Sequence, residues 1–121
     1  LDPDKYMISG SGSFAVRNMR DCADLDVLVT NELGEELKLK YPDHFHEYDF
    51  CDTLDFDGVD IRWNIKEKDR PYSTEYQIDN AEIINGKKYQ PLSMIKFYKQ
   101  RLGRPKDIED IKLIETYENL L

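Results

Sequence analysis

The sequence predicts a mixed α+β domain whose sheet is partly antiparallel, and three patterns support this prediction. Short apolar segments typical of buried strands occupy residues 5–9 and 25–29. The turn pairs Asp57-Gly58 and Asn85-Gly86 indicate two hairpins, and a hairpin pairs its strands antiparallel. Residues 91–121 carry the apolar periodicity of two helices. The expected sheet is therefore mixed, with helices packed on one side of it and two helices at the C-terminal end.

The N-terminal segments are expected to alternate strands with helices. Strand 5–9 runs into a Gly/Ser turn at residues 10–13, and Ser11 or Ser13 can cap a short helix over 14–19. Strand 25–29 follows, with β-branched residues typical of a buried strand. Thr30 or Asn31 can cap the next helix, 32–40, which Gly34 weakens and Pro42 ends. The elements predicted here are therefore strand 5–9, helix 14–19, strand 25–29 and helix 32–40.

The middle of the chain is expected to form two hairpins. Residues 53–57 and 59–65 should pair through Asp57-Gly58, and residues 82–84 and 87–89 through Asn85-Gly86. Strand side chains alternate between faces. In the arm 59–65 this alternation places one apolar set on one face and one polar set on the other: Val59, Ile61, Trp63 and Ile65 against Asp60, Arg62 and Asn64.

Two helices should end the chain. Pro91 suits the start of the first helix, and Gly103 suits its end. Pro105 suits the first position of the second helix. Each helix has an apolar stripe that can pack inward, formed by Leu92, Ile95, Tyr98 and Leu102 in the first and by Ile108, Ile111, Ile114 and Tyr117 in the second.

Length and composition predict one domain, 1–121, with the catalytic sheet and turn-helix in 1–90 and the C-terminal helices in 91–121. A net charge of −8 argues against a general nucleic-acid binder. No apolar run is long enough for a membrane span, and no leader peptide is evident, so a cytoplasmic protein is expected. Cys22 and Cys51 are expected to be reduced, with one disulfide as the alternative. The first residue is Leu1, so the native start is expected to lie before it.

The most informative motif is Gly12-Ser13 followed, after ten residues, by Asp24 and Asp26. The two carboxylates lie two residues apart on a strand and so point the same way. Neighbouring carboxylates repel one another unless a cation lies between them. Mg²⁺ prefers hard oxygen ligands and commonly bridges to phosphates, and a Gly/Ser turn can hold phosphates. The motif therefore predicts a magnesium–phosphate site.

These residues resemble the DNA polymerase β-type nucleotidyltransferase superfamily. Its signature is Gly-Gly or Gly-Ser after an apolar strand, then Asp-x-Asp on the next strand, then a third acid on a later strand. Gly12-Ser13, Asp24 and Asp26 match the first part, and Asp60 matches the third acid. The resemblance implies a polymerase β-like nucleotidyltransferase fold.

A second resemblance lies near the C-terminus. Lys99 precedes Arg104, Lys106, Asp107 and Asp110. This spacing is similar to a segment of lincosamide and aminoglycoside adenylyltransferases and of abortive-infection nucleotidyltransferase toxins. The chain is shorter than those proteins and closer in length to minimal nucleotidyltransferases that pair with a helical partner as antitoxins.

The resemblance implies transfer of a nucleoside monophosphate from a nucleoside triphosphate (NTP) to a hydroxyl group, with pyrophosphate leaving. Asp24, Asp26 and Asp60 would be catalytic and would bind Mg²⁺ or Mn²⁺, with Asp60 as the candidate base. The nucleotide-binding residues would be Gly12, Ser13, Lys99, Arg104 and Lys106.

Each of these assignments has a structural alternative. The acids can be solvated strand residues, and Asp60 can pair with Arg62. Lys99 can be a solvated helix residue, and structural roles are favoured for Arg104, Lys106, Asp107 and Asp110, because Lys106 and Asp110 can pair across one helical turn. His44 and His46 match no standard zinc spacing, so a surface loop or strand is expected there.

Three functions remain open at this level. The leading prediction is the enzyme, acting on a hydroxyl of a small molecule or of a macromolecule such as tRNA or a protein. The second is a toxin–antitoxin component that binds or adenylylates a helical partner protein, which an exposed apolar face including Leu120-Leu121 would favour. The third is a non-catalytic binding domain. Homodimerisation, with a second subunit completing the cleft, is a further expectation.

Overall fold

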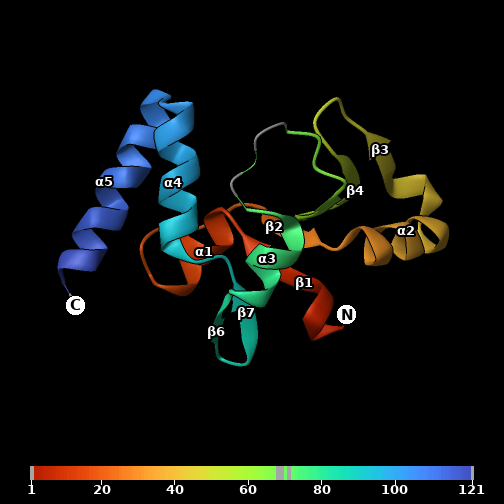
Figure 1. Cartoon of the computed structure of the whole chain (residues 1–121), viewed down its shortest axis with the longest axis horizontal. Coiled ribbons are helices and arrows are strands. Elements are labelled where there is room, and N and C mark those ends of the chain that lie inside the picture. The colour runs from red at the N-terminus through yellow and green to blue at the C-terminus, as the bar shows by residue number, and fades with distance from the viewer. Residues whose placement is uncertain (1, 68–69, 71, 121) are drawn as a thin grey trace.

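A computed structural model describes residues 2–67, 70 and 72–120. Seven strands form one sheet in the order β3-β4-β5-β2-β1-β7-β6 (Figure 1). The strands are β1 (Tyr6–Ser9), β2 (Leu25–Val29), β3 (Phe45–Glu47), β4 (Asp52–Phe56), β5 (Val59–Trp63), β6 (Glu82–Ile84) and β7 (Lys87–Tyr89). The helices are α1 (Ser11–Val16), α2 (Asn31–Lys40), α3 (Thr74–Asp79), α4 (Leu92–Leu102) and α5 (Pro105–Asn119), with 3-10 turns at Pro3–Lys5 and Pro42–His44.

The sheet is mixed, which confirms the predicted α+β class. Strand β2 is antiparallel to β1 and parallel to β5, and β1 is parallel to β7. Both predicted hairpins are present, as β4–β5 and β6–β7.

Helices cover both faces of the sheet, whereas the sequence predicted them on one side. Val27 and Val29 of β2 pack with Leu33 and Leu37 of α2 on the first face. Leu28, on the opposite face, packs with Met7 of β1 and with Ile78 of α3. The difference arises because strand β2 is apolar on both sides and therefore needs a cover on each.

Helix α1 begins earlier than the sequence predicted, directly after the turn. Its N-cap is Gly10, with φ +58° and ψ −129°, a conformation that side-chain-bearing residues rarely adopt. A Cβ at Gly12 would lie 2.5 Å from Ile8 Cγ2 and 3.0 Å from Leu25 Cδ1, so the helix approaches the sheet closely there. The two glycines thus allow the helix to start against the strands, which shifts it from 14–19 to Ser11–Val16.

The second arm of the β4–β5 hairpin ends before its predicted limit. Asn64 has a positive φ of 51°, which breaks the alternation of the strand. Ile65 therefore packs with the Met7 and Leu28 cluster and does not share a face with Val59, Ile61 and Trp63.

One short element, α3, was not predicted, and a second, β3, lies where a loop or strand was expected. Helix α3 is capped by Ser73, whose hydroxyl accepts from Tyr76 N–H at 3.0 Å, and its six residues are too few to show a helical period. Strand β3 carries His46 and pairs with β4, in agreement with the loop or strand expected there. Both cysteines are free.

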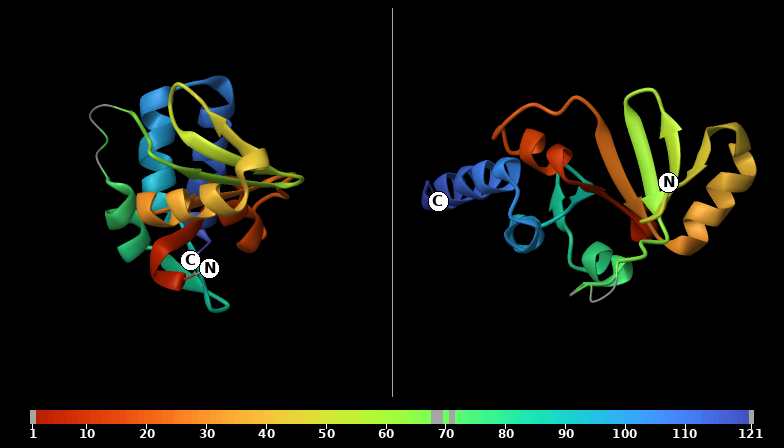
Figure 2. Two further views of the ribbon diagram at one scale, coloured as in Figure 1. Left: turned by 90° about the vertical axis from the view of Figure 1, so that its right-hand side faces the viewer. Right: turned by 90° about the horizontal axis from the view of Figure 1, so that it is seen from above.

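Helices α4 and α5 lie side by side at one end of the sheet (Figures 1 and 2). Phe14 of α1, Ile95 of α4 and Ile114 of α5 form a buried cluster that joins the pair to the rest of the domain. Gly103, with φ +61°, forms the left-handed C-cap of α4. Among the described helices, none is long and apolar enough to cross a membrane.

Substitution of Gly34 by alanine is expected to destabilise the fold, although alanine normally favours a helix by about 1 kcal/mol. A Cβ at this position of α2 would lie 2.2 Å from Trp63 Cγ, and Trp63 is fully buried. We expect a loss of about 3 kcal/mol in the free energy of unfolding, measured by urea denaturation.

The matched control is Glu36→Ala, at an exposed position of the same helix, which should change stability by less than about 0.5 kcal/mol. Equal free energies of unfolding for Gly34→Ala and the wild type would show that the packing of Trp63 against α2 does not require glycine at position 34.

Candidate active site

Two carboxylates lie side by side on neighbouring strands. Asp26 of β2 is in register with Asp60 of β5 because these strands are parallel, and both point to the face opposite α2. The row continues on each side, with Ser9 of β1 in register with Asp26 and Asp55 of β4 in register with Asp60. Asp24 immediately precedes β2. The sheet thus brings together residues from four strands that the sequence separates widely.

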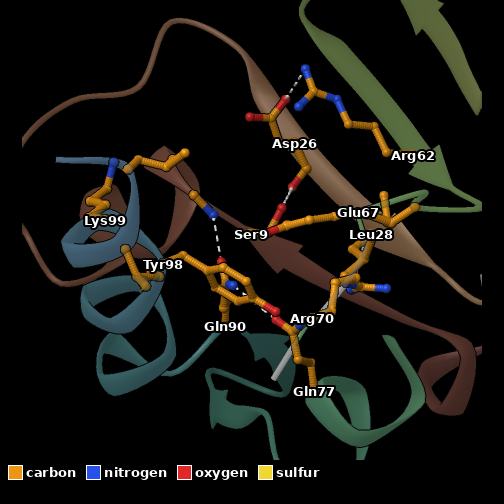
Figure 3. Close-up of a pocket in the computed structure, with 14 residues that line it drawn as sticks. Ser9, Asp26, Leu28, Arg62, Glu67, Arg70, Gln77, Gln90, Tyr98 and Lys99 are labelled. Atoms are coloured by element: carbon orange, nitrogen blue, oxygen red, sulfur yellow. Dashed lines mark hydrogen bonds and ion pairs between the residues drawn. The ribbon is translucent and has the colours of Figure 1, made fainter. Parts of the chain in front are cut away.

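Arg62 supplies the positive charge closest to this pair. Its guanidinium lies 3.7 Å from Asp26 Oδ1 and 4.0 Å from Asp60 Oδ2. Figure 3 shows the Arg62 side chain extending toward Asp26. Arg62 follows Asp60 by two residues on the same strand face, so both residues reach the same place.

Burial and crowding of like charges shift the ionisation of the pair. Burial raises the pKa of Asp26, the Arg62 charge opposes this shift, and the Asp24 charge adds to it. Burial also raises the pKa of Asp60, and a hydrogen bond with Asp55 and the charges of Asp55 and Asp26 raise it further against the effect of Arg62. The pair therefore favours a neighbouring cation.

Two cavities meet at Asp26 and Arg62. The first, of about 360 Å³, lies between the sheet and helices α3 and α4, and we call it the α4 cavity (Figure 3). The second, of about 430 Å³, lies beside the loop before β2, and we call it the acidic cavity. The acidic cavity is lined by Ser11, Arg20, Asp21, Cys22, Ala23, Asp24, Asp26, Asp60 and Arg62. Asp26 and Arg62 line both cavities and so form the wall between them.

All three predicted acids, Asp24, Asp26 and Asp60, line the acidic cavity. Among the described residues, no three His, Cys, Asp or Glu side chains are grouped closely enough to hold a metal ion as they stand. Arg62 occupies the position between Asp26 and Asp60.

The structure places Gly12 and Ser13 in the interior, and neither lines a cavity. Ser13 is fully buried; its hydroxyl donates to Ile8 O at 3.4 Å and its N–H to Gly10 O at 3.0 Å. Other residues of the same segment line the cavities, namely Ser9, Gly10 and Ser11.

Lys99 lines the α4 cavity, as Figure 3 shows, and is paired with two acids of α5. Its Nζ lies 3.4 Å from Asp107 Oδ1 and 2.9 Å from Asp110 Oδ2. Asp110 also accepts from Arg20 at 3.1 Å, which ties the loop before Asp24 to α5. Lys99 is the member of the C-terminal motif that reaches a cavity directly.

The rest of that motif caps the start of α5, where Arg104 is the N-cap residue. Arg104 Nε donates to Asp107 Oδ2 at 2.6 Å, and the Arg104 backbone N–H donates to the same oxygen at 3.1 Å. Asp107 is fully buried, and its hydrogen bonds from Arg104 hold its pKa well below the usual range. Arg104 and Lys106 are exposed, and neither lines a cavity.

Sequence reasoning did not single out Arg62, Asp55, Gln77 or Gln90 as site residues. The alternation of β5 could have indicated Arg62, because it shares the face of Asp60. The hairpin register could have indicated Asp55, which the turn Asp57-Gly58 places opposite Asp60. Nothing in the sequence indicates Gln77 and Gln90, because they meet only in the tertiary structure.

No family model matches the sequence, and no curated protein matches it. Among solved structures, the chain is similar to a putative nucleotidyltransferase from Thermotoga maritima, with 18% identity, a TM-score of 0.56, and coverage of 97% of this chain and 83% of that one. It is also similar to ANT(2″)-Ia, solved in complex with adenylyl-2″-tobramycin, with 18% identity, a TM-score of 0.49, and coverage of 96% and 84%. The likeness to the Thermotoga protein shows that this chain has the nucleotidyltransferase fold.

The hydrogen bonds of the buried Asp107 carboxylate with Arg104 and Lys99 should contribute to stability in a pH-dependent way. Because the folded-state pKa of Asp107 is lowered, its contribution is complete above the ordinary pKa of an aspartate, about 4, and is lost as the pH falls below that value. Asp107→Asn should therefore be less stable than the wild type at neutral pH, and this difference should narrow as the pH is lowered toward about 3.

Urea denaturation at several pH values measures this difference. Glu109→Gln, at an exposed position of the same helix turn, is the control and should track the wild type throughout. A difference between Asp107→Asn and wild type that stays constant with pH would contradict the assigned role of the carboxylate.

Proposed function

We propose that the protein is a magnesium-dependent nucleotidyltransferase that transfers a nucleoside monophosphate from an NTP to a hydroxyl group, with pyrophosphate leaving. The observation that supports this proposal most directly is the facing pair Asp26–Asp60 on the acidic cavity, with Asp26 also lining the α4 cavity. Lys99 stands in one cavity and Asp24 in the other, on a nucleotidyltransferase fold.

The chemistry of the three predicted acids suits a divalent cation, although as they stand they are not grouped closely enough to hold one. Asp24, Asp26 and Asp60 offer only hard carboxylate oxygens, which Mg²⁺ and Mn²⁺ prefer. The position of Arg62 shows that the Asp26–Asp60 pair accommodates a positive group. When bound, the metal would neutralise charge that develops on the phosphates and on the departing pyrophosphate. Asp24, Asp26 and Asp60 would hold the metal, and Arg62 would then have to leave its position beside Asp26 and Asp60.

The α4 cavity is the proposed nucleotide site. Its volume of about 360 Å³ falls within the range of small-ligand pockets, and Leu28, Ile95 and Tyr98 provide apolar walls. Lys99 can contact phosphate oxygens as a point charge. Ser9 and Gly10, also on the wall, place the reacting phosphate near Asp26.

The acidic cavity is the proposed acceptor site. Asp60 lies at its wall and can accept the proton of the attacking hydroxyl, and its raised pKa suits that role. We assign Gly12 and Ser13 to the packing of α1 against the sheet and Arg104 to the N-terminal cap of α5. A phosphate contact from Lys106 would require an approach from outside both cavities.

A second candidate function is the binding of a helical partner protein. Ile108 of α5 and Leu120, which follows α5, are exposed by 48% and 80%. Exposed apolar side chains of this kind favour an interaction surface. Leu121, which the sequence also implicated, lies outside the described residues. Size-exclusion chromatography with light scattering would show whether a second copy of the chain occupies this surface.

Calorimetric titration of ATP, GTP, CTP and UTP, with and without Mg²⁺, tests the proposed function. We expect one triphosphate to bind in a metal-dependent manner and Asp24→Ala/Asp26→Ala to abolish that binding. In a transfer assay, loss of these carboxylates should lower the rate by about a thousandfold, comparable to the removal of other electrostatic stabilisers.

Asp57→Ala is the control, because Asp57 belongs to a second Asp-x-Asp sequence but is exposed at the hairpin turn. Absence of binding by the folded wild type, or equal binding by the double variant, would refute the proposed function.

Lys99→Met is expected to weaken NTP binding by about tenfold or more, because a charge-assisted hydrogen bond contributes about 1.5–3 kcal/mol. Titration calorimetry measures the affinity, and urea denaturation measures the accompanying loss of the α4–α5 ion pairs.

Lys96→Met is the matched control. Lys96 is also on α4 and pairs with two acids of α5, Glu115 and Glu118, at 3.8 and 3.7 Å, but it lines neither cavity. Its loss should lower stability and leave affinity unchanged. Equal affinity losses in the two variants would show that Lys99 has no specific contact with the nucleotide.

A further inference from the structure

A chain of hydrogen bonds runs along the wall of the α4 cavity through two buried amides. Gly10 N–H donates to Gln90 Oε1 at 3.1 Å, and Gln90 Nε2 donates to Gln77 Oε1 at 3.0 Å. Gln77 Nε2 then donates to Tyr72 O at 3.4 Å, and that carbonyl also accepts from Tyr98 OH at 3.3 Å. Gln77 is 2% exposed and Gln90 is 9% exposed, and both line the cavity (Figure 3).

The direction of this chain is determined at both ends by the backbone. Gly10 N–H can only donate, so the Gln90 oxygen must face it and the Gln90 nitrogen must face Gln77. The Tyr72 carbonyl can only accept, so the Gln77 nitrogen faces it. Each amide is therefore held in one orientation, although a glutamine side chain by itself could rotate either way.

The chain connects segments that surround the cavity and are distant in sequence. Gly10 precedes α1, Gln90 lies between β7 and α4, Gln77 is on α3, and Tyr98 is on α4. Figure 3 shows Gln90, Gln77 and Tyr98 together among the residues that line the cavity. The segments that carry Ser9 and Tyr98 are thus joined by polar contacts as well as by packing.

Gly10 is the point at which this chain reaches the acidic pair. A Cβ placed on Gly10 would lie 3.6 Å from Asp26 Oδ2, so the backbone of Gly10 passes close to that carboxylate. Gly10 is the N-cap of α1, makes no side-chain capping hydrogen bond, and has a backbone conformation that few residues adopt. The hydrogen bond from its N–H to Gln90 ties it to the segment between β7 and α4.

We propose that Gln77 and Gln90 are positioning residues for the nucleotide cavity, holding Gly10 beside Asp26 on one wall and Tyr98 on the other. This inference rests on the proposed function. Preorganisation of a site lowers the ordering cost of binding, so an intact chain strengthens nucleotide affinity without either amide acting on the reacting atoms. A break at any link should disconnect Gly10 from Tyr98, because the chain joins them only through both amides.

A double-mutant cycle tests the proposal. The variants are Gln90→Leu, Gln77→Leu and the double variant, and the probe is whichever of ATP, GTP, CTP and UTP the wild type binds most tightly in the presence of Mg²⁺. We expect each single variant to bind about tenfold more weakly and the double variant to bind no more weakly than the worse single variant. This non-additivity is the result expected of a continuous chain.

Ser73→Ala is the matched control for stability. It removes the N-cap of α3, the helix that carries Gln77, and should cost about 1 kcal/mol of folding free energy. Stability by urea denaturation and affinity by calorimetry are compared for all variants under conditions in which each is folded. The control should lose stability and keep wild-type affinity.

The outcomes separate this inference from the proposed function. Wild-type affinity in the glutamine variants would overturn the positioning role alone. An affinity loss in Ser73→Ala as large as that in Gln77→Leu would also overturn it, because destabilisation of α3 would then explain the effect. A folded wild type that binds no triphosphate would refute the proposed function and this inference together.

Discussion

The parallel pairing of β2 with β5 places two carboxylates next to each other, and most features of the site depend on that constraint. Asp26 and Asp60 are in register and half-buried, so their mutual repulsion is only weakly screened by water. Arg62, on the strand face that it shares with Asp60, provides the opposing charge. Asp26 and Arg62 line both cavities, so in the proposed function one cluster of charge would serve both the nucleotide and the acceptor.

The C-terminal helices contribute through charge as well as through packing. Phe14, Ile95 and Ile114 form the apolar contact, and the buried Asp107 binds Arg104, the N-cap of its own helix, and Lys99 of α4. Asp110 extends this network to Arg20, on the loop that precedes Asp24. The motif at the end of the chain therefore supports the cavities mainly by holding two helices and one loop in place, and Lys99 is its direct contribution to a cavity wall.

The Gly/Ser segment has a structural role that its resemblance to a phosphate-binding turn does not reveal. Gly12 allows α1 to approach Ile8 and Leu25, and Ser13 satisfies its polar groups within the fold. The part of the segment that reaches the cavities is Ser9 to Ser11, one turn earlier. Glycine at position 10 also lets the backbone pass close to Asp26. The fold itself therefore requires small residues in this segment, whether or not a ligand binds there.

The sequence by itself determined the elements with a strong local pattern: both hairpins, the strand 25–29, and helices α2, α4 and α5 with their caps. It also indicated Asp24, Asp26 and Asp60, since the spacing of acids on a strand is a local property. It did not determine α3, which is too short for a helical period, nor the side of the sheet that each helix covers. Only the tertiary structure placed Arg62 across the acids and joined Gln77 to Gln90, because those contacts depend on strand register and on helix packing between residues far apart in the chain.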